Sequence, residues 1–117
     1  MNVYRCNFIN IVDGDTFDLE LDLGFSIKIT ERVRLYVDTP EHFGRNASEE
    51  GRNATQFVRD WVKTRENLDG TFYYHSMQYN YLQAAAGRCI GNVTFLDKET
   101  SEIHSLSQDL KEHGFIQ

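Results

Sequence analysis

The sequence predicts an α+β fold in which a helix plugs one end of a small, closed or partly open β-barrel. Hydrophobic and polar residues alternate in the first third of the chain, the period of strands with one solvated face, and the period changes to 3.6 residues near Ser48. The connections between predicted elements are short, and 117 residues correspond to one hydrophobic core. We therefore expect a single domain over residues 1–117.

Three strands are predicted at the start of the chain. The first is mostly β-branched, aromatic or aliphatic and ends at the turn dipeptide Asp13-Gly14. The second alternates between apolar and acidic residues up to Gly24. In the third, Val33 and Leu35 share the face expected to line the barrel interior. These strands, which form a meander, cover residues 3–12, 17–23 and 25–37.

A helix is predicted from Ser48 to about Arg65. Ser48 is a favourable N-cap, and Glu49 and Glu50 suit the first helical turn. After it, β-branched and aromatic residues predict two further strands, over residues 71–79 and 88–96. A short helix is predicted to begin after Ser105. The expected order is three strands, a helix, two strands and a helix.

The composition restricts the classes of function. The chain has 12 Lys and Arg against 18 Asp and Glu, a net charge of −6, so a nucleic acid would have to bind at a local site rather than over the whole surface. With 40% hydrophobic and 13% aromatic residues, the chain is expected to be folded. It shows neither an apolar run of membrane length nor a secretory signal, so we expect a cytoplasmic protein without a membrane partner.

Four carboxylates stand at two predicted strand ends, in the segments Asp13-Gly14-Asp15-Thr16 and Asp38-Thr39-Pro40-Glu41. Carboxylate and carbonyl oxygens are hard ligands suited to Ca²⁺ or Mg²⁺, and a nearby glutamate is suited to orienting or deprotonating an attacking water. A purely structural interpretation also explains them, because Asp-Gly is a common turn and Asp38 could simply follow a strand. Spacing alone leaves both interpretations open.

These segments resemble the staphylococcal nuclease family. The matching stretches follow the family's order along most of the chain: residues 11–16, residues 33–41, residues 44–54, Gly87-Arg88 and residues 105–114. The resemblance implies a five-stranded oligonucleotide-binding (OB) barrel with attached helices. It also implies calcium-dependent hydrolysis of phosphodiester bonds in DNA or RNA. The family's long C-terminal helix has no counterpart here.

The resemblance also implies roles for individual residues. Asp15 and Asp38 would bind one Ca²⁺ ion, with the backbone carbonyl of Thr39 as a third ligand. Glu41 would activate the attacking water. Arg88 and an arginine of the third strand would bind the phosphate. Guanidinium groups suit this role, because the phosphodiester gains negative charge when water attacks it and a guanidinium can bind that charge bidentately.

The strand arginine is either Arg32 or Arg34. The family places this arginine five positions before its aspartate, whereas Arg34 lies four and Arg32 six positions before Asp38. A one-residue change turns a strand side chain to the opposite face, so the pattern does not choose between them. We predict Arg34, because it is closer to Asp38 along the strand.

The sequence therefore predicts a metal-dependent nuclease, that is, a hydrolase that acts on DNA, RNA or both. The alternative is a catalytically inactive module of the same fold that binds nucleic acid or a protein partner. The presence of Asp15, Asp38, Thr39, Glu41 and Arg88 favours the enzyme. The sequence chooses neither between single-stranded and double-stranded nucleic acid nor between oligomeric states.

Overall fold

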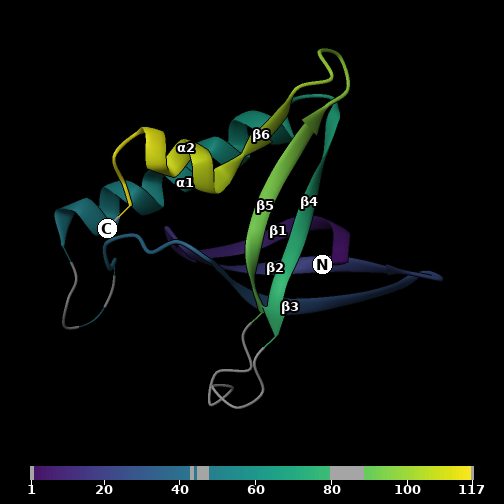
Figure 1. Cartoon of the computed structure of the whole chain (residues 1–117), viewed down its shortest axis with the longest axis horizontal. Coiled ribbons are helices and arrows are strands. Elements are labelled where there is room, and N and C mark those ends of the chain that lie inside the picture. The colour runs from purple at the N-terminus through teal and green to yellow at the C-terminus, as the bar shows by residue number, and fades with distance from the viewer. Residues whose placement is uncertain (1, 43, 45–47, 80–88, 117) are drawn as a thin grey trace.

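The computed structural model describes residues 2–42, 44, 48–79 and 89–116. Within these residues the chain forms six strands and two helices (Figure 1). The elements are β1 (Asn2–Asp13), β2 (Thr16–Gly24), β3 (Ile27–Leu35), α1 (Glu49–Glu66), β4 (Gly70–Tyr79), β5 (Cys89–Asp97), β6 (Ile103–Ser105) and α2 (Leu106–Glu112).

Five of these strands close into a mixed β-barrel. The order in the sheet is β3-β2-β1-β4-β5, and β5 pairs back to β3. The β3–β5 pairing is parallel and short, from Val33 opposite Cys89 to Leu35 opposite Gly91, whereas the other neighbours are antiparallel. The predicted α+β barrel is therefore confirmed. The short strand β6, which pairs with β5 outside the ring, was not predicted.

The third strand is shorter than predicted at both ends. Phe25 and Ser26 have φ values of 53° and 61°, so they form the turn between β2 and β3 instead of the start of a strand. After Leu35 the chain leaves the strand, and the N–H of Tyr36 donates to the carbonyl of Gly91 on β5. The prediction that residues 25–37 are one strand is wrong in these two segments.

The barrel interior and the inner faces of both helices form one hydrophobic core. The fully buried side chains come from four strands and two helices and include Phe17, Leu19, Val33, Leu35, Val58, Tyr74, Val93, Phe95, Leu106 and Leu110. The helices also contact each other, because the indole Nε1–H of Trp61 on α1 donates to Asp109 of α2 at 2.8 Å. The guanidinium of Arg65 lies 4.1 Å from the centre of the Trp61 ring. Helix α1 thus packs on the core together with α2.

Both helices begin where the cap residues predict. The Ser48 hydroxyl accepts the N–H of Gly51, and the Ser105 hydroxyl accepts the N–H of Gln108. Gly114 follows α2 with a φ of 79°, the left-handed conformation common after a helix end. Among the residues that the structure describes, no helix is long and apolar enough to cross a membrane.

Candidate metal and phosphate site

Asp15 occupies the tight turn between β1 and β2. Its side chain is buried, because the whole residue is only 6% exposed. One carboxylate oxygen accepts the hydroxyl of Thr16 at 3.0 Å, and the other accepts the backbone N–H of Thr39 at 3.1 Å. The second bond joins the turn to the segment that follows β3. Asp15 therefore holds two distant parts of the sequence together at one end of the barrel.

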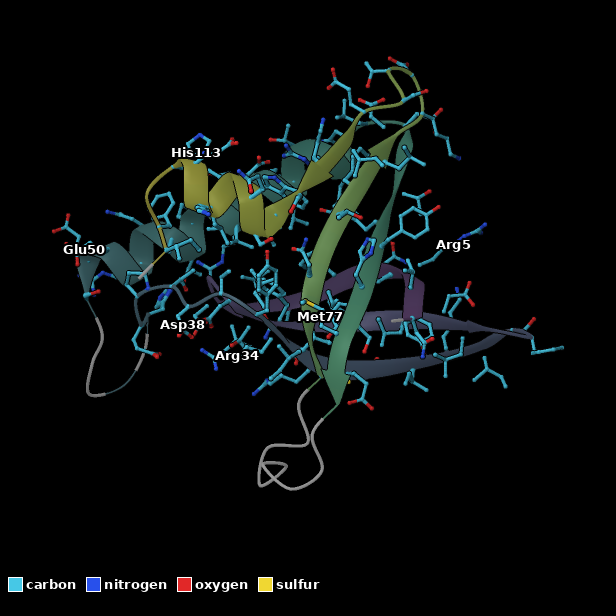
Figure 2. The ribbon with its side chains drawn as sticks, viewed as in Figure 1. Arg5, Arg34, Asp38, Glu50, Met77 and His113 are labelled. Carbon is cyan, nitrogen blue, oxygen red and sulfur yellow. The ribbon has the colours of Figure 1, made fainter. Side chains whose placement is uncertain are left out.

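Arg34 brings a positive charge between two carboxylates. Its Nη2 atom lies 3.7 Å from the Oδ2 atom of Asp15 and donates a hydrogen bond to Oδ1 of Asp38. Figure 2 shows Arg34 and Asp38 side by side at this end of the molecule. The three side chains differ in exposure, from 8% for Asp15 through 38% for Arg34 to 62% for Asp38. The site thus extends from a buried carboxylate to the surface.

Arg32, the other candidate, is engaged elsewhere. It lies opposite Asp18 in the β2–β3 pairing, and its guanidinium donates to both carboxylate oxygens of Asp18 at 2.8 and 3.2 Å. This ion pair holds the pKa of Asp18 below its usual range. Of the two strand arginines, only Arg34 contacts the predicted metal ligands.

The contact between Arg34 and Asp38 corrects one expectation. An unbroken strand through residue 37 would place these side chains far apart along its axis. Because β3 ends at Leu35 and the chain bends, the two side chains touch. The bend after Leu35 therefore allows Arg34 to reach Asp38.

Gly14 and Thr39 pack tightly beneath the carboxylates. A Cβ atom on Gly14 would lie 2.7 Å from the Thr39 hydroxyl oxygen and 3.0 Å from the Cβ of Ala54 on α1. Thr39 is 3% exposed, and its hydroxyl oxygen has no hydrogen-bond partner in the described part of the chain. A buried polar atom without a partner is costly, so this hydroxyl is an unsatisfied group in the segment that Asp15 binds through the Thr39 N–H.

Glu41 is anchored through its backbone and leaves its side chain exposed. Its carbonyl oxygen accepts the N–H of Ser48 at 3.0 Å. A Cβ on Gly51 would come within 1.7 Å of the same oxygen, so only a glycine allows α1 to approach this closely. The start of α1 thereby determines where Glu41 stands relative to the β1–β2 turn.

Asp13 is an acidic residue of this site to which sequence reasoning assigned no role. Its carboxylate accepts the N–H of Asp15 at 3.1 Å. Burial raises the pKa of Asp13 to about 7. A side-chain hydrogen bond with Asp15 and the negative charges of Asp15 and Glu41 act in the same direction, whereas the bond from the Asp15 N–H lowers this pKa. The only signal in the sequence was its position two residues before Asp15. The raised pKa depends on burial, which the local pattern does not reveal.

Five of the six predicted site residues therefore have a described position. Asp15, Arg34, Asp38 and Thr39 are linked directly, and Glu41 lies close enough for its charge to act on Asp13. Arg88 lies outside the described residues.

The donor set suits a hard cation, although it is small. Within residues 2–42, 44, 48–79 and 89–116, no three His, Cys, Asp or Glu side chains are grouped as ligands of one metal ion. Asp15 and Asp38 supply two carboxylates, so further ligands would have to be backbone or hydroxyl oxygens, such as those of Thr39, or water. Comparison of the chain with known protein families and with curated proteins found no match.

Proposed function

We propose that the chain is a metal-dependent phosphodiesterase that hydrolyses DNA, RNA or both, with Ca²⁺ as the metal. One observation carries the proposal: two carboxylates from separate strand ends, Asp15 and Asp38, converge on a single positive group. We further propose that the barrel is an OB-fold, to which the five-stranded mixed topology conforms.

The residues present fit a divalent cation. The guanidinium of Arg34 stands where a cation shared by Asp15 and Asp38 would lie, so the site already stabilises positive charge at this position. The backbone N–H of Thr39 donates to Asp15, and the carbonyl and hydroxyl oxygens of the same residue would add uncharged hard ligands. When bound, the ion would supply positive charge to a phosphate oxygen. Asp15, Asp38 and Thr39 are the residues that would hold it.

The other side chains of the site have separate tasks. With a cation between the carboxylates, the Arg34 guanidinium is released and offers paired N–H donors to a phosphate, which it binds bidentately. Glu41 presents an exposed carboxylate held in place by the start of α1, and such a group takes a proton from a water molecule. Arg88 would add a second guanidinium, as the resemblance implies.

The charge of the chain limits how a substrate binds. A net charge of −6 repels a polyanion, so binding depends on the arginines and the cation at this one site. We therefore expect weak, metal-dependent binding of a short stretch of nucleic acid. We do not expect sequence-independent binding along a long duplex.

The test is cleavage of fluorescently labelled single-stranded DNA and RNA with Ca²⁺ or with a chelator. Cleavage should occur only with Ca²⁺, and Asp15→Asn and Asp38→Asn should both weaken Ca²⁺ binding in calorimetry, because an amide oxygen is a poorer ligand than a carboxylate. Glu41→Gln should retain Ca²⁺ binding and lose about 100-fold or more in turnover.

Asp18→Asn is the matched control, because Asp18 is an acidic residue on β2 whose partner is Arg32. It should leave both Ca²⁺ affinity and turnover unchanged. Binding of DNA or RNA without any cleavage, with or without Ca²⁺, would contradict the proposal and favour the inactive binding module.

A further inference from the structure

The turn between β2 and β3 carries an exposed apolar surface far from the acidic site. Phe25 is 98% exposed, Ile27 is 53% exposed and Leu23 is 41% exposed. We call these three residues the apolar tip. Figure 1 shows the hairpin formed by β2 and β3 extending beyond the rest of the barrel. A contiguous apolar surface of this kind is uncommon on a monomer and typically marks an interaction site.

The backbone holds Phe25 in this position at a cost. Phe25 and Ser26 adopt φ values of 53° and 61°, the left-handed region in which Gly, Asn or Asp are the usual residues of a two-residue turn. A bulky residue in this region is a genuine outlier, and such conformations are concentrated at functional segments. The turn therefore presents an aromatic ring where an ordinary hairpin would present a glycine or an asparagine.

A complementary hollow lies on the outer face of β1, β4, β5 and β6. It has a volume of about 210 Å³ and is lined by Val3, Tyr73, His75, Thr94, Leu96 and Ile103. We call it the apolar hollow. The Nε2 atom of His75 and the hydroxyl of Thr94 are hydrogen-bonded to each other at 2.7 Å, which leaves carbon atoms to line most of the cavity. At the rim, Val3 is 51% exposed and Ile103 is 69% exposed.

We propose that the apolar tip of one copy of this chain inserts into the apolar hollow of a second copy. Because every copy carries both surfaces, two copies exchange tips around a twofold axis and form the contact twice. A phenylalanine ring buries about 150–250 Å² in such a contact, and the hollow that would receive it has a volume of about 210 Å³. Each chain thus supplies both contacting surfaces, the apolar tip and the apolar hollow.

Charges of both signs lie beside the two surfaces. Arg5 lies opposite Tyr73 of the hollow in the β1–β4 pairing, and Asp22 lies at the base of the tip. In the described part of the chain neither side chain has an ion pair, and Asp22 only accepts the N–H of Gly24. Asp22 also lies opposite Lys28 in the β2–β3 pairing, and Arg5, Asp22 and Lys28 line one pocket of the same chain, so charges of both signs border the two surfaces.

The same charges argue against a lipid surface as the partner. Asp18 and Glu20 of β2 form ion pairs with Arg32 and Lys28 of β3, and the chain as a whole carries a net charge of −6. An anionic membrane would repel a chain of this net charge. A second copy offers both an apolar cavity and a nearby arginine, so the observations favour it.

The dimer should be weak. Two exchanged tips bury less than the 1,200–2,000 Å² or so of a standard stable interface, so we expect a dissociation constant on the order of 10–100 µM. Sedimentation equilibrium of the full chain between about 5 and 500 µM covers this range. The wild type should pass from monomer to dimer and should not grow into longer assemblies.

Single substitutions separate the two surfaces. Phe25→Asp removes the tip, and Ile103→Asp places a charge at the rim of the hollow; each should weaken the dimer at least tenfold. Ile9→Asp is the matched control, because Ile9 is 58% exposed on β1 but belongs to neither surface. This variant should dimerise like the wild type. Dispersed amide NMR spectra of all three variants would show that they are folded.

Mixing the variants tests the contact itself. Isotope-labelled Phe25→Asp protein keeps its hollow, and unlabelled Ile103→Asp protein keeps its tip. Addition of the second to the first should shift the amide signals of Thr94, Leu96 and neighbouring hollow residues, whereas addition of unlabelled Phe25→Asp protein should not. Shifts confined to other surfaces would contradict the proposal.

Three further results would also overturn it: a wild type that stays monomeric at 500 µM or so, a Phe25→Asp variant that dimerises as well as the wild type, and monomeric wild type that binds phosphatidylcholine vesicles through Phe25. None of these results depends on cleavage activity, so this proposal and the proposed function can fail separately.

Discussion

Replacing Arg34 by methionine should change metal affinity and turnover in opposite directions. The Arg34 guanidinium occupies the position between Asp15 and Asp38 that a bound cation would take, so the arginine and Ca²⁺ compete for the same carboxylates. Methionine keeps much of the aliphatic stem without the charge. The variant should therefore bind Ca²⁺ more tightly and cleave more slowly, because it lacks the guanidinium that would bind the phosphate in the proposed reaction.

The size of the effect follows from the 3.7 Å separation between Arg34 and Asp15. Two unit charges about 4 Å apart interact by about 1 kcal/mol in water and about 4 kcal/mol at the effective dielectric constant of a protein surface. Because the Arg34 side chain is 38% exposed, we take about 1–2 kcal/mol. This corresponds to Ca²⁺ binding about 5–30 times more tightly. The lost phosphate contact should lower turnover by about 30-fold, equivalent to about 2 kcal/mol.

Calorimetric titration with Ca²⁺ and single-turnover cleavage measure the two quantities on the same protein. Arg32→Met is the matched control, because Arg32 lies two residues away on the same strand and pairs with Asp18. It should change neither quantity. Unchanged or weaker Ca²⁺ binding by Arg34→Met, or an equal response of both variants, would refute the reasoning.

Three further predictions concern stability. Burial and neighbouring acids raise the pKa of Asp13 from 3.8 to about 7. Between these two pH values the folded chain keeps a proton that the unfolded chain has released. The free energy of unfolding therefore falls as the pH rises from about 4 to about 7. Asp13→Asn should reduce this fall by about 1–2 kcal/mol, a value that allows for the half-exposed side chain. Urea unfolding with chelator at pH 4 and pH 8 measures it. An equal loss of unfolding free energy between the two pH values in variant and wild type would disprove the prediction. Trp61→Phe removes the hydrogen bond to Asp109 and should cost about 1–2 kcal/mol in the same assay, with turnover retained. Gly14→Ala places a methyl group against Thr39, so it should lower the free energy of unfolding by about 1–3 kcal/mol and weaken Ca²⁺ binding. A variant as stable as the wild type would show that the turn is looser than described.

The regular elements were predictable because their signals are local. The alternation of residues 17–23 and the cap at Ser48 act within a few neighbours, so they indicated β2 and the start of α1 directly. Strand β6 was missed because three residues are too few for a period, and its pairing with β5 depends on the tertiary fold. Phe25 was assigned to a strand because aromatic residues favour strands and rarely adopt positive φ.

The candidate site was predictable in its acids and less so in its arginine. Asp15 and Asp38 stand in short motifs, which a sequence displays directly. The choice between Arg32 and Arg34 depends on the register of β2 and β3, which places Arg34 opposite Thr16 and Arg32 opposite Asp18. Register is set by the turn and by the packing of both strands, so counting residues before Asp38 could not resolve it.

The short seam between β3 and β5 has a consequence for folding. It joins Val33–Leu35 to Cys89–Gly91, segments separated by the whole of α1 and β4. The β1–β2 and β2–β3 pairings join immediate sequence neighbours, whereas the β1–β4 pairing also spans α1. Loop closure over such a distance is entropically costly, so the seam is expected to form late and to open early in local unfolding. Arg34 belongs to this seam. The guanidinium therefore reaches its place between the carboxylates only when the ring of strands is complete, and assembly of the site reports closure of the barrel.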